Sequence, residues 1–312
     1  MSSKKTKLVT SSYAYHAGPP FWGQANRERW YKYSLASICN MGVDVICYTD
    51  ERERGLQDLL EVKERFNLDN LTIKVHNLEN NPWHERVYDL KINKHPEIYN
   101  NPNDFRYRHS SEMYWSKFLF LQNELEPDIN LYWIDGGLSH NGLFPMEASS
   151  YSDDPDYAKQ YPGQVYSEIE YRYYYFDRAF NPETLARINA YQDDKIINIC
   201  RYGISDNNMH LFSEKIKDMS QLGYIHYPVG GFFGGNSNLL QEYINAAFDT
   251  VEKVLDSGDY VCTDQEVMWY VNSKYPHLFK NYSFDTFYHE DWTNVFQPGQ
   301  VSLSHFFRKP LN

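Results

Sequence analysis

Short apolar runs alternate with amphipathic segments over the first part of the chain. Residues 7–13, 43–48 and 71–75 are apolar runs of strand length, and residues 27–40 and 55–66 carry apolar side chains at helical spacing. This order of strand, helix, strand, helix and strand favours parallel strands with helices packed on the faces of the sheet. We therefore predict an α/β fold with a Rossmann-like, mostly parallel central sheet.

The remainder of the chain continues this pattern less regularly. Helices are predicted over residues 113–125, 182–190, 238–255 and 263–272, and strands over residues 130–135, 196–201 and 301–307. Residues 80–108 are rich in Asn and Pro and predict a long loop or an inserted subdomain, whereas the Tyr-rich residues 147–175 favour no single assignment. We find neither an internal repeat nor a low-complexity linker, so the simplest prediction is a single domain over residues 1–312.

Composition indicates a folded protein and disfavours two kinds of partner. Hydrophobic residues make up 42% and charged residues 23%, which is typical of globular chains. The 28 tyrosines could stack on sugars or bases, or could reflect composition bias alone. The net charge of −12 repels nucleic acid and anionic membranes, although a local basic groove stays open as an alternative.

Targeting signals and cysteines point to the cytoplasm. The basic residues 1–7 are not followed by an apolar run long enough for a signal peptide or a membrane span. The four cysteines lie in apolar surroundings without C-x-x-C spacing, which is typical of reduced, buried thiols. We expect a cytoplasmic protein without a membrane span.

The sequence Tyr-Trp-Ile-Asp-Gly-Gly at residues 132–137 brings one carboxylate, Asp135, to the end of an apolar strand. Ligands of open α/β sheets bind beyond the carboxyl ends of the strands. A carboxylate there can hold a hard cation, which in turn can hold a diphosphate. An Asp that merely initiates a turn is the alternative, and this segment alone does not decide between the two.

A glycine-rich segment, Gly-Gly-Phe-Phe-Gly-Gly-Asn at residues 230–236, comes just before the long predicted helix. We interpret it as a turn, because paired glycines permit positive φ and close approach of the backbone to a ligand. The rings of Phe232 and Phe233 could wall a sugar pocket. Glycine-rich turns before helices are common, so the segment alone is a weak signal.

Two further segments combine structural and chemical roles. Thr-Asp-Gln-Glu at residues 263–266 is the pattern of a helix capping box, and a capped helix start can also present Asp264 and Gln265 to a ligand. Near the end of the chain, His305 could complete a metal site, and Lys309 could pair with phosphate. The alternative for this last segment is a final apolar strand.

Together these segments resemble the retaining glycosyltransferases of the glycogenin and bacterial lipopolysaccharide galactosyltransferase type, which have the GT-A fold. Those enzymes carry a strand-terminal Asp-x-Asp, a glycine-containing turn on the acceptor side, Asp-Gln-Asp, and a C-terminal His followed by Lys-Pro. The four segments occur here in the same order. Trp-Ile-Asp-x-Gly and Gly-Gly-Phe-Phe-Gly-Gly look closer still to the HtrL/YibB-type family of bacterial glycosyltransferases. The likeness spans roughly residues 7–310 in the order of elements and is specific at these short motifs.

The resemblance implies metal-dependent transfer of a sugar from a nucleotide-sugar, a UDP-sugar above all, to a glycan or other acceptor with retention of stereochemistry. It implies a donor-binding half over about residues 1–140 and an acceptor-side half over about residues 141–312. The implied residues are Asp135 and His305 for Mn²⁺ (or Mg²⁺); Thr10, Ser11, Tyr13, Lys117 and Lys309 for the donor; Gly231, Phe232, Phe233 and Gly234 for the acceptor; and Asp264 and Gln265 for catalysis.

One departure from the family pattern leaves rival functions open. Gly137 stands where the second Asp of Asp-x-Asp is expected, and the loss of a carboxylate should weaken metal binding. A binding protein that holds a nucleotide-sugar or glycan without turnover is therefore the first alternative. A sugar transferase acting on modified nucleic acid is the second, although the net charge argues against it. A glycoside hydrolase is a third, but we see no convincing pair of carboxylates for it.

Overall fold

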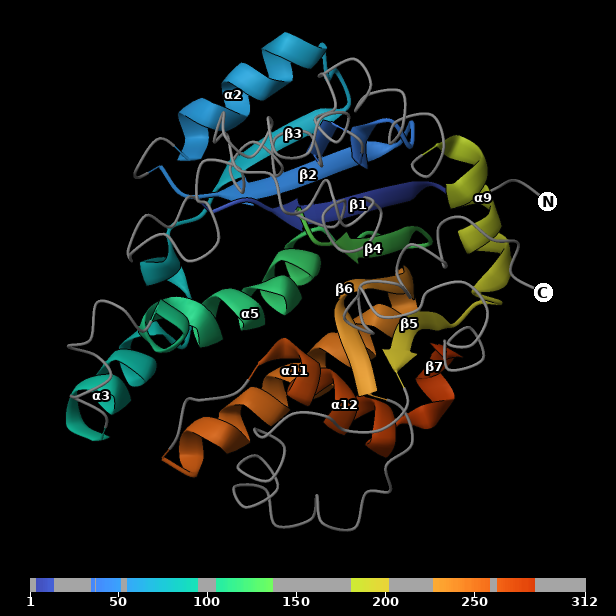
Figure 1. Cartoon of the computed structure of the whole chain (residues 1–312). Coiled ribbons are helices and arrows are strands. Elements are labelled where there is room, and N and C mark those ends of the chain that lie inside the picture. The colour runs from blue at the N-terminus through green and yellow to red at the C-terminus, as the bar shows by residue number, and fades with distance from the viewer. Residues whose placement is uncertain are drawn as a thin grey trace, which may run out of the picture.

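The computed structural model describes residues 4–13, 35–36, 38–51, 55–94, 105–136, 181–201, 227–258 and 263–283. A seven-stranded sheet in the order β3-β2-β1-β4-β6-β5-β7 runs through its centre (Figure 1). The strands are β1 Thr6–Ser11, β2 Asp44–Thr49, β3 Leu71–Val75, β4 Asn130–Ile134, β5 Ile196–Arg201, β6 Tyr227–Asn236 and β7 Phe279–Ser283.

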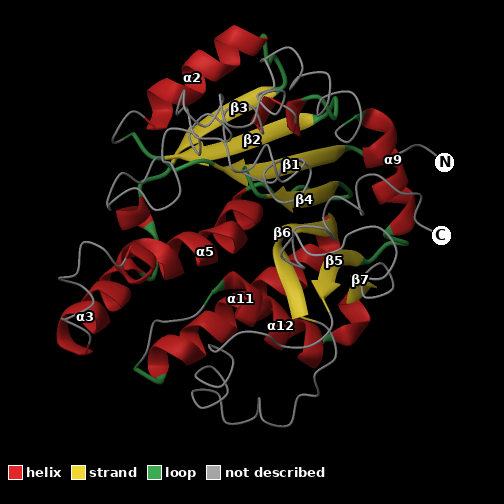
Figure 2. Cartoon of the chain, viewed as in Figure 1, coloured by secondary structure: helices red, strands yellow, loops and turns green. Residues whose placement is uncertain are grey.

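Helices cover both faces of this sheet (Figure 2). They are α2 Gly55–Phe66, α3 His84–Lys94, α5 Phe105–Asn123, α9 Pro182–Tyr191, α11 Ser237–Asp256 and α12 Asp264–Lys274, with 3₁₀ turns at Leu78–Asn80 and Pro276–Leu278. The bounds of α2, β3 and β5 are those predicted from the sequence. Asn181 caps α9, because its side chain accepts a hydrogen bond from the Thr184 backbone N–H at 2.9 Å.

The sheet is mostly parallel, as predicted. β3, β2, β1 and β4 are joined by parallel pairing, and so are β5 and β7. β6 is antiparallel to both of its neighbours, β4 and β5. The carboxyl ends of β1 and β4 therefore meet the beginning of β6 at one edge of the sheet, which is the edge where the sequence predicts a ligand.

Alternation along the strands builds two hydrophobic cores, one on each face of the sheet. On one face, residues 35–36 and 38–41, α2 and α9 cover side chains such as Leu8, Tyr132 and Phe232. On the other face, α3, α5, α11 and α12 cover side chains such as Trp133 and Phe233. Figure 1 shows α5, α11 and α12 together on one side of the strands and α2 and α9 on the other.

The prediction of a long loop or an inserted subdomain over residues 80–108 is wrong where the structure describes it. This region contains the helix α3, and α5 begins at Phe105. The sequence pattern of α3 gives only a weak helix signal, and the helix is stabilised by tertiary contacts. Val87 is fully buried, the Trp83 indole N–H donates to Glu252 of α11 at 3.0 Å, and Arg86 donates to Glu252 and Asp256.

The prediction of a turn over residues 230–236 is also wrong, because these residues form part of the strand β6. Gly234 and Gly235 have φ of 138° and 152°, conformations that side chains disfavour. A Cβ on Gly234 would lie 2.3 Å from the Leu131 carbonyl oxygen, and one on Gly235 would lie 2.3 Å from that of Lys195. The glycines therefore serve close packing of β6 between its two neighbours rather than reversal of the chain.

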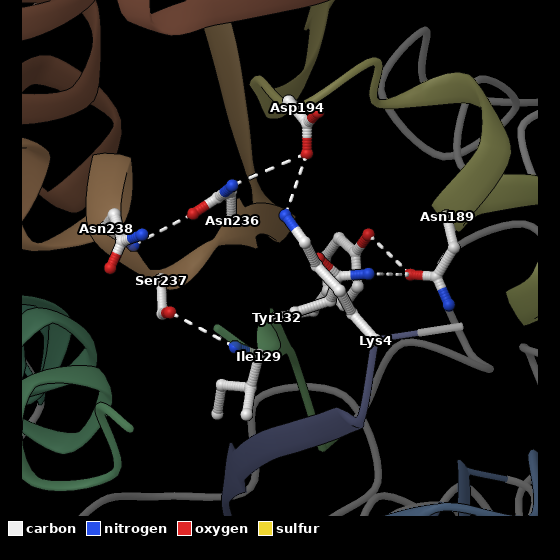
Figure 3. A network of polar contacts seen from close by, with 9 residues as sticks. Lys4, Ile129, Tyr132, Asn189, Asp194, Asn236, Ser237 and Asn238 are labelled. Atoms are coloured by element: carbon white, nitrogen blue, oxygen red, sulfur yellow. Dashed lines mark hydrogen bonds and ion pairs between the residues drawn. The ribbon is translucent and has the colours of Figure 1, made fainter. Parts of the chain in front are cut away.

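A polar network ties the amino-terminal edge of the parallel strands together, opposite the predicted ligand edge (Figure 3). Lys4 donates to the Asp194 carboxylate at 2.9 Å, and Asn236 at the end of β6 joins the same carboxylate at 3.5 Å. The Tyr132 hydroxyl donates to Asn189 of α9 at 2.8 Å. These contacts anchor β4, β6 and α9 away from the candidate site.

Within the described ranges, none of the helices has both the length and the apolar composition needed to cross a bilayer.

Candidate functional site

Four elements meet where β4 ends. Asp135 directly follows β4, and its backbone N–H donates to the Gly231 carbonyl of β6 at 2.8 Å. α12 packs against β6 and α5, and α5 packs against β4. The chain then turns at Gly136, where a Cβ would lie 2.5 Å from the Ser11 carbonyl oxygen of β1. This edge therefore collects side chains from distant parts of the sequence.

The centre of the site is the ammonium group of Lys117, which extends from α5. Its Nζ lies 2.7 Å from Asp264 Oδ2, 3.0 Å from Asp135 Oδ1 and 3.0 Å from the Gly230 carbonyl oxygen. The Lys117 and Asp264 side chains are only 9% and 4% exposed, whereas that of Asp135 is 32% exposed. Asp135 is thus the member of the cluster that meets solvent.

Aromatic and backbone groups complete the surroundings of the ammonium. The Trp133 ring lies 5.5 Å from Lys117 Nζ, within the range of a cation–π contact. The Trp133 indole N–H also donates to Asp135 Oδ1 at 2.8 Å, so one oxygen of Asp135 accepts from two groups. A Cβ on Gly230 would lie 1.9 Å from Asp264 Oδ2, so only glycine lets the carboxylate approach β6 this closely.

Burial and charge act in opposite directions on the two buried members. Burial raises the pKa of Asp264, the charge of Lys117 opposes that rise, and the charge of Asp135 adds to it. Burial by itself would lower the pKa of Lys117, but attraction to Asp135 and Asp264 outweighs it and raises that pKa above its ordinary value. Lys117 is therefore held in its charged form.

The start of α12 fixes Asp264 in place. Thr263 and Glu266 form the predicted capping box, in which the Glu266 carboxylate accepts from the Thr263 backbone N–H. Asp264 is the first residue of the helix, where the helix dipole favours negative charge. Gln265, the next residue, is half-buried. Both roles predicted for this segment thus fall on one helix start, and only the capping role is confirmed.

The predicted donor residues of β1 lie at the same edge. Thr10 is fully buried, and its Oγ1 has no hydrogen-bond partner within the described structure; a Cβ on Gly136 would be 3.4 Å from it. Ser11 ends β1 and is half-buried. Tyr13 donates its hydroxyl to the His76 carbonyl at 2.9 Å and stacks on Phe120, with 6.3 Å between ring centroids.

The predicted acceptor residues do not form a pocket wall among the described residues. Phe232 and Phe233 are both fully buried, and they belong to the cores on opposite faces of the sheet. Gly231 and Gly234 are buried within β6. The two rings diverge because consecutive residues of a strand point to opposite faces of the sheet, so contact of these residues with an acceptor stays a prediction.

The side chains at this edge do not by themselves suit a divalent cation. The described part of the chain contains no group of three or more His, Cys, Asp or Glu side chains that could hold a metal. The two carboxylates of the cluster, Asp135 and Asp264, each have one oxygen paired with the ammonium of Lys117. His305 and Lys309, which the sequence assigned to the metal and the diphosphate, lie outside the described residues.

The sequence predicted most members of this cluster but not how they pair. Asp135, Asp264 and Lys117 were each predicted, with Lys117 assigned to the donor rather than to the two carboxylates. The roles of Trp133 and Gly230 in holding the cluster were missed. The YWIDGG motif already contains Trp133, and its spacing of two residues before Asp135 puts both on one face of an extended chain, which is a usable signal.

Comparisons with known proteins place the chain near no family by sequence. No family profile and no curated protein matches it. Among solved structures it is similar to apo mouse xyloside xylosyltransferase 1, with 9% identity, a TM-score of 0.44, and coverage of 89% of this chain and 85% of that one.

Two other structures have similar scores. A galactosyltransferase, LgtC, in complex with donor and acceptor sugar analogues matches with 10% identity, a TM-score of 0.43, and coverage of 96% of this chain and 82% of that one. A 4-diphosphocytidyl-2C-methyl-D-erythritol synthase from Anaerococcus prevotii matches with 10% identity, a TM-score of 0.37, and coverage of 97% and 95%. At such scores these likenesses do not bear on activity.

Proposed function

We propose that this chain is a glycosyltransferase that takes a sugar from a nucleotide-sugar donor bound at the carboxyl edge of the sheet. The observation that carries the proposal is the cluster of Lys117, Asp135 and Asp264, assembled there from three separate segments of the chain. Structures with open α/β sheets bind ligands at this edge, and nucleotides are among their commonest ligands. The GT-A resemblance of the sequence motifs gives the sugar-transfer class.

In this proposal the partly exposed Asp135 faces the donor, and Asp264 and Gln265 act beside the transferred sugar. Sugar transfer develops positive, oxocarbenium-like charge on the sugar, which a fixed carboxylate or amide oxygen stabilises. Thr10, Ser11 and Tyr13 would contact the nucleotide from the end of β1. The buried hydroxyl of Thr10, which has no hydrogen-bond partner among the described residues, supports this placement. Because the described residues do not fit a metal, no step is assigned to one.

His305 and Lys309 remain part of the proposal through the sequence motifs alone. In the resembled arrangement, His305 would join Asp135 on Mn²⁺ (or Mg²⁺), and Lys309 would meet the charge of the leaving diphosphate. The acceptor is proposed to be a glycan or another hydroxyl compound, and the location cytoplasmic.

A second function is favoured by one observation. Asp264 is 4% exposed and bound by Lys117, so its carboxylate does not face solvent. A protein that binds a nucleotide-sugar without transferring the sugar would need no more than this. Slow hydrolysis of the donor in the presence of Mn²⁺ distinguishes the enzyme from such a binding protein.

The proposal is tested by a thermal-shift screen against nucleotide-sugars, with and without Mn²⁺. A ligand that binds the native state stabilises it by mass action, and the midpoint of thermal unfolding rises as a result. At a ligand concentration of a hundred times its Kd, the added free energy of unfolding is about 2.7 kcal/mol. We expect UDP-sugars to raise the midpoint, and Asp135→Ala to remove that rise while the protein stays folded. Calorimetry that shows the same UDP-sugar affinity for wild type and Asp135→Ala would rule out a donor site at Asp135.

A further inference from the structure

We propose that the Lys117 ammonium is the resident cation of this site. The ammonium occupies the position that a divalent metal would take between Asp135 and Asp264, and it positions Asp264. The positioning of Asp264 for sugar transfer rests on the proposed function. The occupation of the cation position does not, because it is a property of the folded chain alone.

The contacts of the ammonium are those of a small cation in an oxygen cage. An ammonium has three N–H donors, and Lys117 Nζ lies within 3.0 Å of three oxygens: Oδ2 of Asp264, Oδ1 of Asp135 and the carbonyl oxygen of Gly230. Two carboxylates and a backbone carbonyl are also the oxygen ligands that hard divalent cations prefer. A metal that used Asp264 and Asp135 together would therefore have to displace Lys117.

Neighbouring residues build the cage around the ammonium. Gly230 leaves room that any side chain would fill, since a Cβ there would lie 1.9 Å from Asp264 Oδ2 and 3.3 Å from Lys117 Nζ. The Trp133 ring lies 5.5 Å from the ammonium, and its indole N–H donates at 2.8 Å to Asp135 Oδ1, the same oxygen that Lys117 contacts. A cationic group is expected where an electron-rich ring and two carboxylates converge.

The contacts of Lys117 also fix the orientation of Asp264. Its ammonium lies 2.7 Å from Asp264 Oδ2 and 3.0 Å from Asp135 Oδ1, so it links the two carboxylates. Lys117 is thus a positioning residue. It keeps Asp264 turned toward Asp135 and the edge of the sheet, and it does so without meeting solvent itself, because its side chain is 9% exposed.

Removing the ammonium should convert the cage into a metal site. Lys117→Met keeps most of the volume of the side chain but leaves Asp264, Asp135 and the Gly230 carbonyl facing one another without a positive charge. We expect this variant to bind Mn²⁺ at least tenfold more tightly than wild type, and the added substitution Asp264→Asn to abolish the gain. In the wild-type background, Asp264→Asn should leave Mn²⁺ affinity unchanged.

The experiment is a titration of the full chain with Mn²⁺, without nucleotide, that follows the paramagnetic resonance signal of the free ion. Lys74→Met is the matched control, because Lys74 pairs at 2.5 Å with one buried carboxylate, Glu124, and should leave no cage behind. Circular dichroism verifies folding. No donor is present in this titration, so a thermal-shift screen without donor binding would not change its interpretation. Likewise, an unchanged Mn²⁺ affinity in Lys117→Met would not contradict donor binding in the screen.

Two results would overturn the inference. The first is a folded Lys117→Met protein with wild-type Mn²⁺ affinity. The second is wild-type Mn²⁺ binding that weakens tenfold or more in Asp264→Asn, since Asp264 would then be a metal ligand beside Lys117. If Lys117→Met does not fold, the comparison of wild type with Asp264→Asn decides alone.

Discussion

Asp264 takes part in two structural arrangements at once. It opens α12 behind a capping box, and its carboxylate is held by a buried lysine. Because burial is the largest influence and raises its pKa, folding should be linked to the protonation of this group.

The linkage has a defined sign. A carboxyl with a folded-state pKa above the unfolded value of about 3.9 binds its proton more tightly in the folded protein. Its contribution to stability is present below about pH 4 and is lost as the pH rises through the folded-state pKa. The free energy of unfolding of wild type, minus that of Asp264→Asn, should therefore fall as the pH rises from the acid side, as urea denaturation at stepped pH would measure.

Glu126 supplies a control of opposite sign. The hydrogen bond from Lys7 lowers the pKa of this exposed carboxyl, so any contribution is present above about pH 4.3 and lost as the pH falls. The same subtraction for Glu126→Gln should be flat or rise with pH. If Asp264→Asn gives a rising difference too, the carboxyl of Asp264 is dominated by Lys117 rather than by burial.

A substitution at Gly230 can test how closely the Asp264 carboxylate packs on β6. A methyl group there would lie 1.9 Å from Asp264 Oδ2, so Gly230→Ala must push the carboxylate away and should cost about 1–3 kcal/mol of stability. In an Asp264→Ala background the obstacle is gone, and the same substitution should cost less than about 1 kcal/mol, because residues in contact are not additive. Equal costs in the two backgrounds, by urea denaturation, would place the strain elsewhere.

At the scale of elements, the sequence predicted well where local pattern and tertiary structure agree. Apolar runs predicted the strands β3 and β5 to the residue, and helical spacing predicted α2. It failed at α3, whose contacts to α11 come from far along the chain. It failed again at β6, because glycine pairs indicate turns in general, and only the neighbouring strands reveal that close packing requires them here.

The strand character of β6 leads to a prediction about Gly234. Its φ is 138°, and a Cβ added there would lie 2.3 Å from the Leu131 carbonyl oxygen, so Gly234→Ala would strain both β6 and β4. We expect a loss of more than about 2 kcal/mol in the free energy of unfolding. Gly55→Ala is the comparison, since Gly55 opens α2 and its nearest contact is a side-chain oxygen, Thr49 Oγ1, at 3.0 Å. If Gly234→Ala loses no more free energy of unfolding than Gly55→Ala does, the close strand packing at Gly234 is contradicted.

At the scale of the whole molecule, the parallel sheet explains why the sequence could predict the location of the site but not the pairing of its side chains. Strand ends converge on one edge, so a carboxylate after β4 and a hydroxyl at the end of β1 could be predicted to be neighbours. The pairing of Lys117 with Asp264, 147 residues apart, could not, because it depends on how α5 and α12 pack on the sheet. Periodicity places a residue on a face of its helix but does not choose its partner.

The chain end tests whether the site extends beyond the described residues. The sequence motifs assign His305 to the metal and Lys309 to the diphosphate, whereas a plain terminal segment would tolerate loss of its last residues. If the assignment holds, a protein truncated after Ser304 should fold with the wild-type thermal midpoint but lose UDP-sugar binding in calorimetry. His305→Ala should weaken binding mainly when Mn²⁺ is present, since its role passes through the metal, and Lys309→Ala should weaken it with and without Mn²⁺, since an ammonium pairs with the diphosphate directly.

Lys280→Ala, which removes a partly exposed lysine from β7, controls for loss of one positive charge and should bind as wild type does. Normal donor affinity in the truncated protein would remove both residues from the site and leave Asp135, with Lys117 and Asp264 behind it, as the charged cluster of the described residues that the donor meets.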